Sequence, residues 1–196
     1  MTDWGALYRE HVADVSALAA GLTDDQLATT VPGTPSWTVR EVLAHMAGCP
    51  SDVVTGRMDG APGPEWTSRH VAERRHLPVS DLVEELQTHQ DAIVESVADN
   101  PTPAAVWDLA VHHADLHEAL DLPRLPGHLW MPVVDALEPR LPPGLADTVP
   151  PYELFRALFS RRSRAQLAAW GTALPADELD AICIFGPRQD DQPVPA

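Results

Sequence analysis

The sequence predicts an all-α protein, an up-and-down bundle of four long helices with an additional C-terminal helix and an extended tail. Three observations carry this prediction. Apolar residues recur with the 3.6-residue period of an amphipathic helix in several long segments. Prolines and glycines gather between those segments, where they indicate loops. Strand-like segments alternating with helices, the pattern of a parallel sheet, are not evident.

The first predicted helix spans residues 4–20, where apolar side chains follow the helical period. A second helix opens at Thr38, because Glu41 three residues later completes a capping-box pattern. We expect Pro50 to end or kink this helix near Gly48, since proline lacks the backbone donor that a helix interior needs.

A short helical piece over 67–75 follows a loop rich in proline and glycine. The third long helix is predicted from about residue 79 to 97, and the fourth from about 103 to 121. Residues 122–151 carry eight prolines and one short apolar piece. A fifth strong helix is predicted over 152–170, where leucine, phenylalanine and tryptophan recur at helical spacing.

Residues 181–185 predict a short strand or a docked extended segment. From Gly186 the sequence is polar and proline-rich, which predicts a frayed tail. We therefore divide the chain into a four-helix bundle over residues 1–121 and a second part over residues 122–196, in which a proline-rich connection, a C-terminal helix and the tail pack on the bundle.

Charge excludes several classes of function. The 196 residues carry 13 basic and 29 acidic side chains, a formal net charge of −16, which disfavours binding to nucleic acid or to an anionic membrane. Every basic residue is an arginine. Without lysine the chain has no Schiff-base nucleophile and no phosphate-binding P-loop lysine.

Compartment is predicted from what the sequence lacks. No apolar run approaches the length of a membrane span, and residues 1–20 carry three carboxylates in place of a signal-peptide core. The two cysteines, Cys49 and Cys183, do not make a disulfide framework. We expect a cytoplasmic protein, a monomer or a homodimer.

A candidate metal site lies in the segment from Trp107 to Leu116. Asp108 and His112 are four residues apart, so in a helix they stack on one face. A carboxylate and a histidine on a mostly buried helix need a partner. A metal ion with His45 of the second helix as third ligand would satisfy both, because two imidazoles and a carboxylate suit zinc or iron(II).

Several alternatives remain open on spacing alone. Asp108 and His112 can form a plain hydrogen-bonded core pair. His113 and His117 make a second pair four residues apart, and His-x-x-x-His is ordinarily the better metal signature. Asp115 shares the face of Asp108 and His112 and can orient His112. Cys49, four residues after His45, is either a thiolate ligand or a small buried hydrophobe.

The segment from Arg161 to Arg164 holds the densest group of basic residues. These arginines are either solvated charges paired with nearby carboxylates or a clamp for a substrate carboxylate, which a guanidinium binds through two parallel hydrogen bonds. We take Arg162 and Arg164, with Asp115, as tentative substrate-binding residues, and leave the catalytic residues unassigned. The tryptophans are expected mostly in the core, although some can wall a ligand pocket.

Read together, several segments resemble one family. Pro35-Ser36-Trp37-Thr38-Val39-Arg40-Glu41-Val42-Leu43-Ala44-His45-Met46-Ala47-Gly48 resembles the second-helix motif of the mycothiol-dependent maleylpyruvate isomerase-like proteins, which belong to the DinB-like metal-binding four-helix bundles. Asp108 to Leu116 resembles their later-helix motif. Weaker likenesses lie at Asp59-Gly60-Ala61-Pro62 with Trp66 and Arg74, and near the C-terminus at Arg162 to Trp170 and Phe185 to Arg188.

The resemblance implies a bundle that holds one divalent metal ion, usually zinc, through His45, Asp108 and His112. It also implies an association with the thiol mycothiol in isomerase or S-transfer reactions on a small electrophile. One departure stands out, because the family more often has glutamate where this chain has Asp108. The segment 122–151 also looks too short for a full second domain.

The sequence thus supports two hypotheses of different class. The first is an enzyme dependent on a divalent metal and on mycothiol, either a transferase or an isomerase. The alternative is a non-catalytic bundle that binds a metal or a small molecule. Metal content and turnover with a thiol distinguish them.

Overall fold

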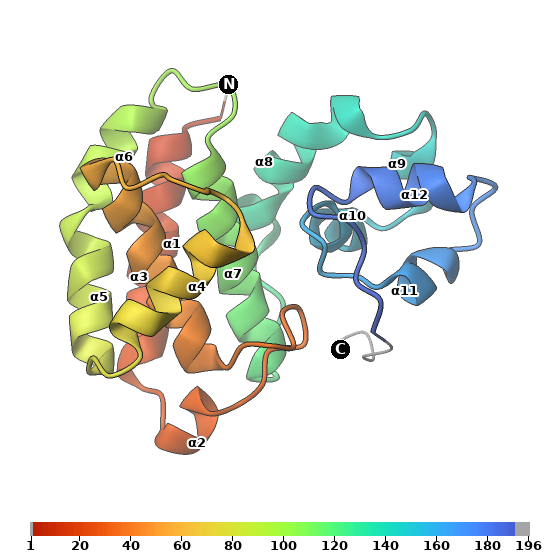
Figure 1. Cartoon of the computed structure of the whole chain (residues 1–196). Coiled ribbons are helices and arrows are strands. Elements are labelled where there is room, and N and C mark those ends of the chain that lie inside the picture. Colours follow the sequence, from red (N-terminus) through yellow and green to blue (C-terminus); the bar gives the residue numbers. More distant parts are fainter. Residues whose placement is uncertain (1, 191–196) are drawn as a thin grey trace.

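The chain is a helical protein, as the sequence predicts. A computed structural model describes residues 2–190. Within that range the regular elements are helices, and the loops contain two isolated β-bridges. Four columns of helix form a bundle on one side of the molecule, in which the first and last columns run in one direction and the two middle columns in the other (Figure 1). They are α1 (Trp4–Ala20), α3 (Val39–Thr55), the pair α5 (Val79–Thr88) and α6 (Gln90–Val97), and α7 (Ala104–Ala119).

Shorter helices surround the bundle. α2 (Asp24–Leu27) lies at one end, and α4 (Pro64–Arg74) packs on α3. α8 contacts both α7 and α10, and the remaining elements gather beside it on the far side of α7 from α5 (Figure 1). The C-terminal elements are α8 (Gly127–Leu137), the 3₁₀ turn η1 (Glu138–Arg140), α9 (Leu145–Thr148), α10 (Pro151–Leu158), α11 (Arg164–Ala168) and α12 (Ala176–Ile182).

One hydrophobic core joins the bundle to the C-terminal helices. Val15, Val42, Ile93 and Val106, from the four columns, are fully buried, and the same contiguous core includes Phe155 of α10. Burial of such aliphatic and aromatic side chains is the main favourable term in folding. Among the described residues, none of the helices has the length and apolar character needed to cross a membrane.

Two predicted helices differ in the structure. α3 does not end near Gly48: it continues through Pro50 to Thr55 and stops at Gly56, whose φ of 75° only glycine adopts readily. One missing donor at Pro50 is tolerated because residues 42–50 of the helix are buried against neighbouring helices. The predicted third helix is divided at His89 into α5 and α6.

The predicted fifth helix over 152–170 is wrong as a single helix. α10 ends at Leu158, Ser160 takes a left-handed φ of 64°, and α11 begins anew with a capping box at Ser163. This break has a physical reason, because it turns Arg161 and Arg162 back towards α7.

The C-terminal segment is more ordered than predicted. Residues 181–185 are the end of α12 and a docked stretch in which the Ile184 amide donates to the carbonyl of Leu158 (2.8 Å), so they are not a strand. Up to Asp190 the tail is ordered rather than frayed. Arg188 forms a backbone β-bridge with Ser163, and its side chain donates to the carbonyl of Pro32. The prediction for residues 191–196 lies outside the described residues.

An ionic network fixes the C-terminal part to α7. The fully buried Arg156 donates to Asp115, to Glu118 (2.8 Å) and to the carbonyl of Val111 (3.0 Å). Arg161 donates to Asp115 at 2.9 Å. Arg162, 1% exposed, donates to Glu153 (2.6 Å) and Glu118 (3.3 Å).

This network corrects the prediction of solvated arginines for Arg161 and Arg162, while Arg164 remains exposed and paired with Asp180. Since each buried guanidinium is matched by carboxylates, loss of one partner leaves an uncompensated charge in the interior.

Arg162 and Arg164 therefore make a matched pair for measurement. We expect Arg162→Gln to lower the free energy of unfolding by about 3–5 kcal/mol, because it leaves Glu153 without its arginine and removes one of the two arginines at Glu118. Arg164→Gln, on an exposed ion pair, should change it by less than about 1 kcal/mol. Denaturant unfolding of both variants checks this, and equal losses would contradict the difference in burial.

A histidine pair links α1, α7 and α8 in the core. His11 Nε2 donates to the carbonyl of Leu129 (3.0 Å), so its Nδ1 accepts from Nδ1–H of His113 (3.0 Å). Burial lowers the pKa of His11 to about 4 and that of His113 to about 2. Both rings are neutral in the folded protein at pH 7.

This pair predicts acid sensitivity. Folded His11 takes up a proton only near pH 4, whereas in the unfolded chain a histidine does so near pH 6.5. Between those values the unfolded state holds more protons, so stability falls as the pH drops. We expect His11→Leu to flatten this dependence by up to about 1.4 kcal/mol per pH unit. Urea unfolding of metal-free protein from pH 7 to 4 measures it, and parallel curves would refute the assignment.

Candidate metal centre

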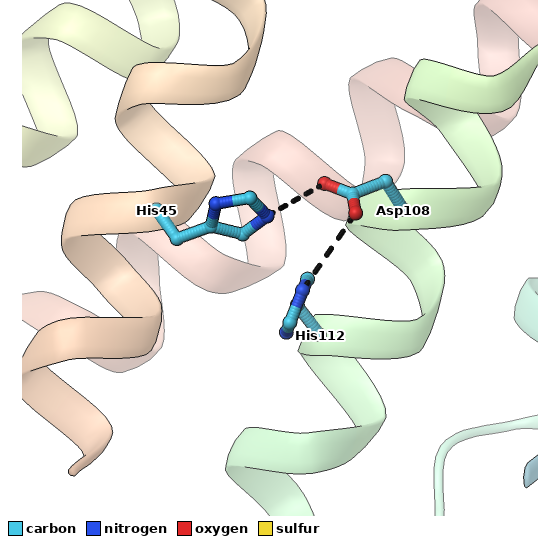
Figure 2. A group of neighbouring side chains, drawn as sticks. All are labelled: His45, Asp108 and His112. Carbon is cyan, nitrogen blue, oxygen red and sulfur yellow. Dashed lines mark ion pairs between the residues drawn. The ribbon is translucent and has the colours of Figure 1, made fainter. Parts of the chain in front are cut away.

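Three side chains predicted as ligands meet between two columns of the bundle. His45 points from α3, and Asp108 and His112 point from consecutive turns of α7 (Figure 2). One ligand atom from each lies within 4.8 Å of the others. Asp108 Oδ2 is 3.4 Å from His45 Nε2, and Oδ1 is 3.7 Å from His112 Nε2.

These separations fit a zinc ion. Tetrahedral coordination with zinc bonds of about 2.0–2.2 Å places neighbouring ligand atoms roughly 3.3 Å apart. The two separations that involve Asp108 are close to that value, and all three ligand atoms lie within 4.8 Å of one another. Asp108 therefore lies near enough to both imidazoles, because α3 and α7 pack directly against each other.

The centre opens on the side of the carboxylate. The side chains of His45 and His112 are 2% and 4% exposed, whereas that of Asp108 is 32% exposed. Burial opposes ionisation of Asp108, but His45 and His112 outweigh it and hold its pKa well below the usual range. The centre thus offers one anionic ligand and two imidazoles, with access for a further ligand next to Asp108.

The His112 ring is held by residues behind it. Its Nδ1 donates to Asp115 at 2.9 Å, which leaves the lone pair on Nε2. Arg161 Nη2, itself bound to Asp115, lies 3.3 Å from both ring nitrogens of His112. The half-buried Trp37 stacks on this ring, with centroids 6.0 Å apart, and also lies against His45 at 5.1 Å.

The His45 ring has its own support on α3 and α4. Its Nδ1 is 3.0 Å from Nδ1 of His70, and His70 Nε2 is 2.9 Å from Oδ2 of Asp52. Burial is the main effect that lowers the pKa of His70. Burial would raise the pKa of Asp52, but hydrogen bonds from His70 and Arg69 outweigh it and lower the value.

The alternative metal ligands considered from the sequence, His113, His117 and Cys49, are not part of this cluster. His113 bonds to His11 of α1, and Nδ1 of His117 bonds to the carbonyl of Pro123 (2.7 Å), so this pair faces away from Asp108. Cys49 is buried beside the centre and its thiol hydrogen-bonds to Asp108. Burial and Asp108 raise the pKa of Cys49 well above its usual value in the metal-free protein, and Cys49 is not part of the cluster that His45, Asp108 and His112 form.

The tentative substrate-binding residues are placed differently from one another. Asp115 is fully buried and accepts from Arg156, Arg161 and His112, the orienting position considered for it from the sequence. Arg162 is buried against Glu153, and Arg164 is exposed beside Asp180. All three are occupied by partners within the chain, so a role in substrate binding stays a prediction.

Sequence reasoning missed the supporting residues His70 and Asp52 and gave no specific role to Arg161. His70 carried no motif of its own, since it lies on a polar helix that is distant in sequence from the three candidate ligands. A signal did exist in Gly48, an otherwise unfavourable residue in a helix interior. A Cβ at Gly48 would lie 2.6 Å from Cγ of His70, so the glycine makes room for this ring.

Comparison with known proteins gives one match. No curated protein and no solved structure matches the chain. The profile of the family described as "Mycothiol maleylpyruvate isomerase N-terminal domain" matches residues 8–137. This match runs from within α1 to the end of α8 and includes all three residues of the candidate centre. The chain belongs to the mycothiol maleylpyruvate isomerase N-terminal domain family.

Proposed function

We propose that the chain binds one divalent metal ion, zinc by preference, through His45, Asp108 and His112. We further propose that it uses mycothiol as a thiol co-substrate in an S-transfer or isomerisation reaction on a small electrophile. The observation that best supports this proposal is that three potential ligand atoms lie within 4.8 Å of one another in a member of this family. Both imidazoles engage Nδ1 elsewhere and turn Nε2 towards Asp108.

Each residue at the proposed centre would have a distinct role. These three residues would hold a zinc ion with one position open, at which a bound thiol would be stabilised as its nucleophilic thiolate. His45 and His112 supply neutral lone pairs, and Asp108 supplies negative charge. Asp115 and Trp37 keep His112 in place. Arg161 is adjacent to His112 and is paired with Asp115, so it holds the two residues together behind the centre.

Metal content is the first test. Protein purified without a histidine tag or chelator should contain about one zinc ion per chain. His45→Ala and His112→Ala should each abolish this content, because two ligands hold zinc poorly. His117→Ala serves as the control from the rival pair and should retain the metal. The opposite pattern, with metal lost only on removal of His113 and His117, would refute the proposed centre.

Thiol binding is the second test. At about 100 times Kd, mycothiol should stabilise metal-loaded protein by about 2.7 kcal/mol, which raises Tm by roughly 5–10 °C. Because the thiolate is the bound form, binding should release a proton and tighten as the pH rises towards about 8.5.

The control for this test is the metal-free His45→Ala variant, which mycothiol should leave unchanged. Calorimetry in two buffers of different ionisation enthalpy measures the released proton. Equal binding of mycothiol to metal-loaded and metal-free protein would show that the metal ion is not the binding site of the thiol. Thiol binding without turnover of any electrophile would favour the non-catalytic alternative.

A further inference from the structure

We propose that Asp52 and His70 are positioning residues that fix the tautomer and the orientation of His45, so that its Nε2 lone pair faces Asp108. This inference rests on the proposed metal centre and adds two residues to it. The contacts form a continuous line from a buried carboxylate to a ligand. Asp52 and His70 are 0% exposed and His45 is 2% exposed.

The hydrogen positions along this line follow from the chemistry of Asp52. An ionised carboxylate only accepts hydrogen bonds, and Arg69 as well as His70 lies within bonding distance of Asp52 Oδ2. His70 Nε2 therefore carries a hydrogen. A neutral imidazole has a single N–H, so His70 Nδ1 is left as an acceptor.

The acceptor at His70 Nδ1 in turn determines which nitrogen of His45 carries hydrogen. Its Nδ1 lies 3.0 Å from the His70 acceptor and must be the donor. A neutral His45 ring is then bare at Nε2, the atom that lies 3.4 Å from Asp108 Oδ2. Metal binding requires this tautomer, because a nitrogen that carries hydrogen has no lone pair to give. The line thus favours in His45 the tautomer that a metal ion would need.

Packing holds the His70 ring in this position. It lies against the backbone of α3 at Gly48, where a Cβ would approach His70 Cγ to 2.6 Å. The buried Trp66 also contacts the ring, edge-on with centroids 4.2 Å apart. The ring is therefore in close contact with both a helix backbone and an indole, which restricts its movement.

The second imidazole of the centre, His112, is held in the same tautomer by direct contact with a carboxylate. Asp115 accepts directly from Nδ1 of His112 at 2.9 Å, while Asp52 acts on His45 through the intermediate ring of His70. Two independent buried carboxylates thus leave both Nε2 atoms bare. This parallel supports a positioning role for Asp52 and His70 rather than incidental burial.

Two variants of His70 separate positioning from packing. His70→Asn places an amide oxygen close to where Nδ1 stands and keeps an acceptor for His45, whereas His70→Leu fills similar space without one. Competition with a chromophoric chelator would measure zinc affinity. We expect His70→Leu to weaken zinc binding about 10–100-fold and His70→Asn to recover most of that loss. His11→Leu, at another buried histidine pair, should leave affinity unchanged.

A measurement on metal-free wild-type protein needs no variant. Imidazole ¹⁵N chemical shifts should show His45 protonated at Nδ1 and bare at Nε2, and His70 protonated at Nε2. The reverse tautomer of His45 would overturn the inference, as would wild-type zinc affinity in folded His70→Leu. Equal weakening in the Leu and Asn variants would leave only a packing role for His70. Failure of wild-type protein to bind zinc would instead refute the proposed function, while the tautomer of His45 would still decide this inference.

Discussion

The structure depends on a polar stripe that α7 presents to the interior of the protein. Asp108, His112, Asp115 and Glu118 follow one another at helical spacing, and each must be partnered because an unpaired charge in a protein interior is costly. The stripe obtains its partners from two directions. α3 brings His45 to one end, and the segment around α10 brings three arginines to the other.

Asp115 connects these two ends. It accepts from Arg156 and Arg161, which fasten the C-terminal part to the bundle, and it also orients His112 in the candidate centre. Gly33 of the loop before α3 lies so close that a Cβ there would approach Asp115 Oδ1 to 2.4 Å. Fold and site therefore share one carboxylate, and a change that loosens the C-terminal part should also disturb the ring of His112.

The features predicted correctly from the sequence are those encoded locally. The capping box of Thr38 and Glu41 does start α3, and helical spacing does place Asp108 and His112 on one face of α7. The apolar period likewise identified α1. Spacing within one helix says nothing about which face of another helix it will meet, so the prediction of His45 as the third ligand rests on the chemistry of a zinc site and then on the family resemblance.

The missed features depend on partners distant in the chain. The break at Ser160 is explained only by Asp115 and Glu118, which lie more than thirty-five residues earlier and draw Arg161 and Arg162 inward. Continuation of α3 through Pro50 depends on its packing against α4, α5 and α7. His70 acquires its position through Asp52 and Gly48 on a neighbouring helix, a relation that no single-helix pattern contains.

Burial of Arg74, Arg156, Arg161 and Arg162 has a consequence for how small molecules reach the protein. The chain already carries a formal charge of −16, and these four cations lie inside, bound to carboxylates. Solvent therefore meets a surface poor in positive charge. An anionic electrophile would approach against a repulsive field, so its association rate should rise with ionic strength. A neutral electrophile would approach at a rate that salt leaves nearly unchanged, which makes kinetic salt dependence a guide to the charge of the unknown substrate.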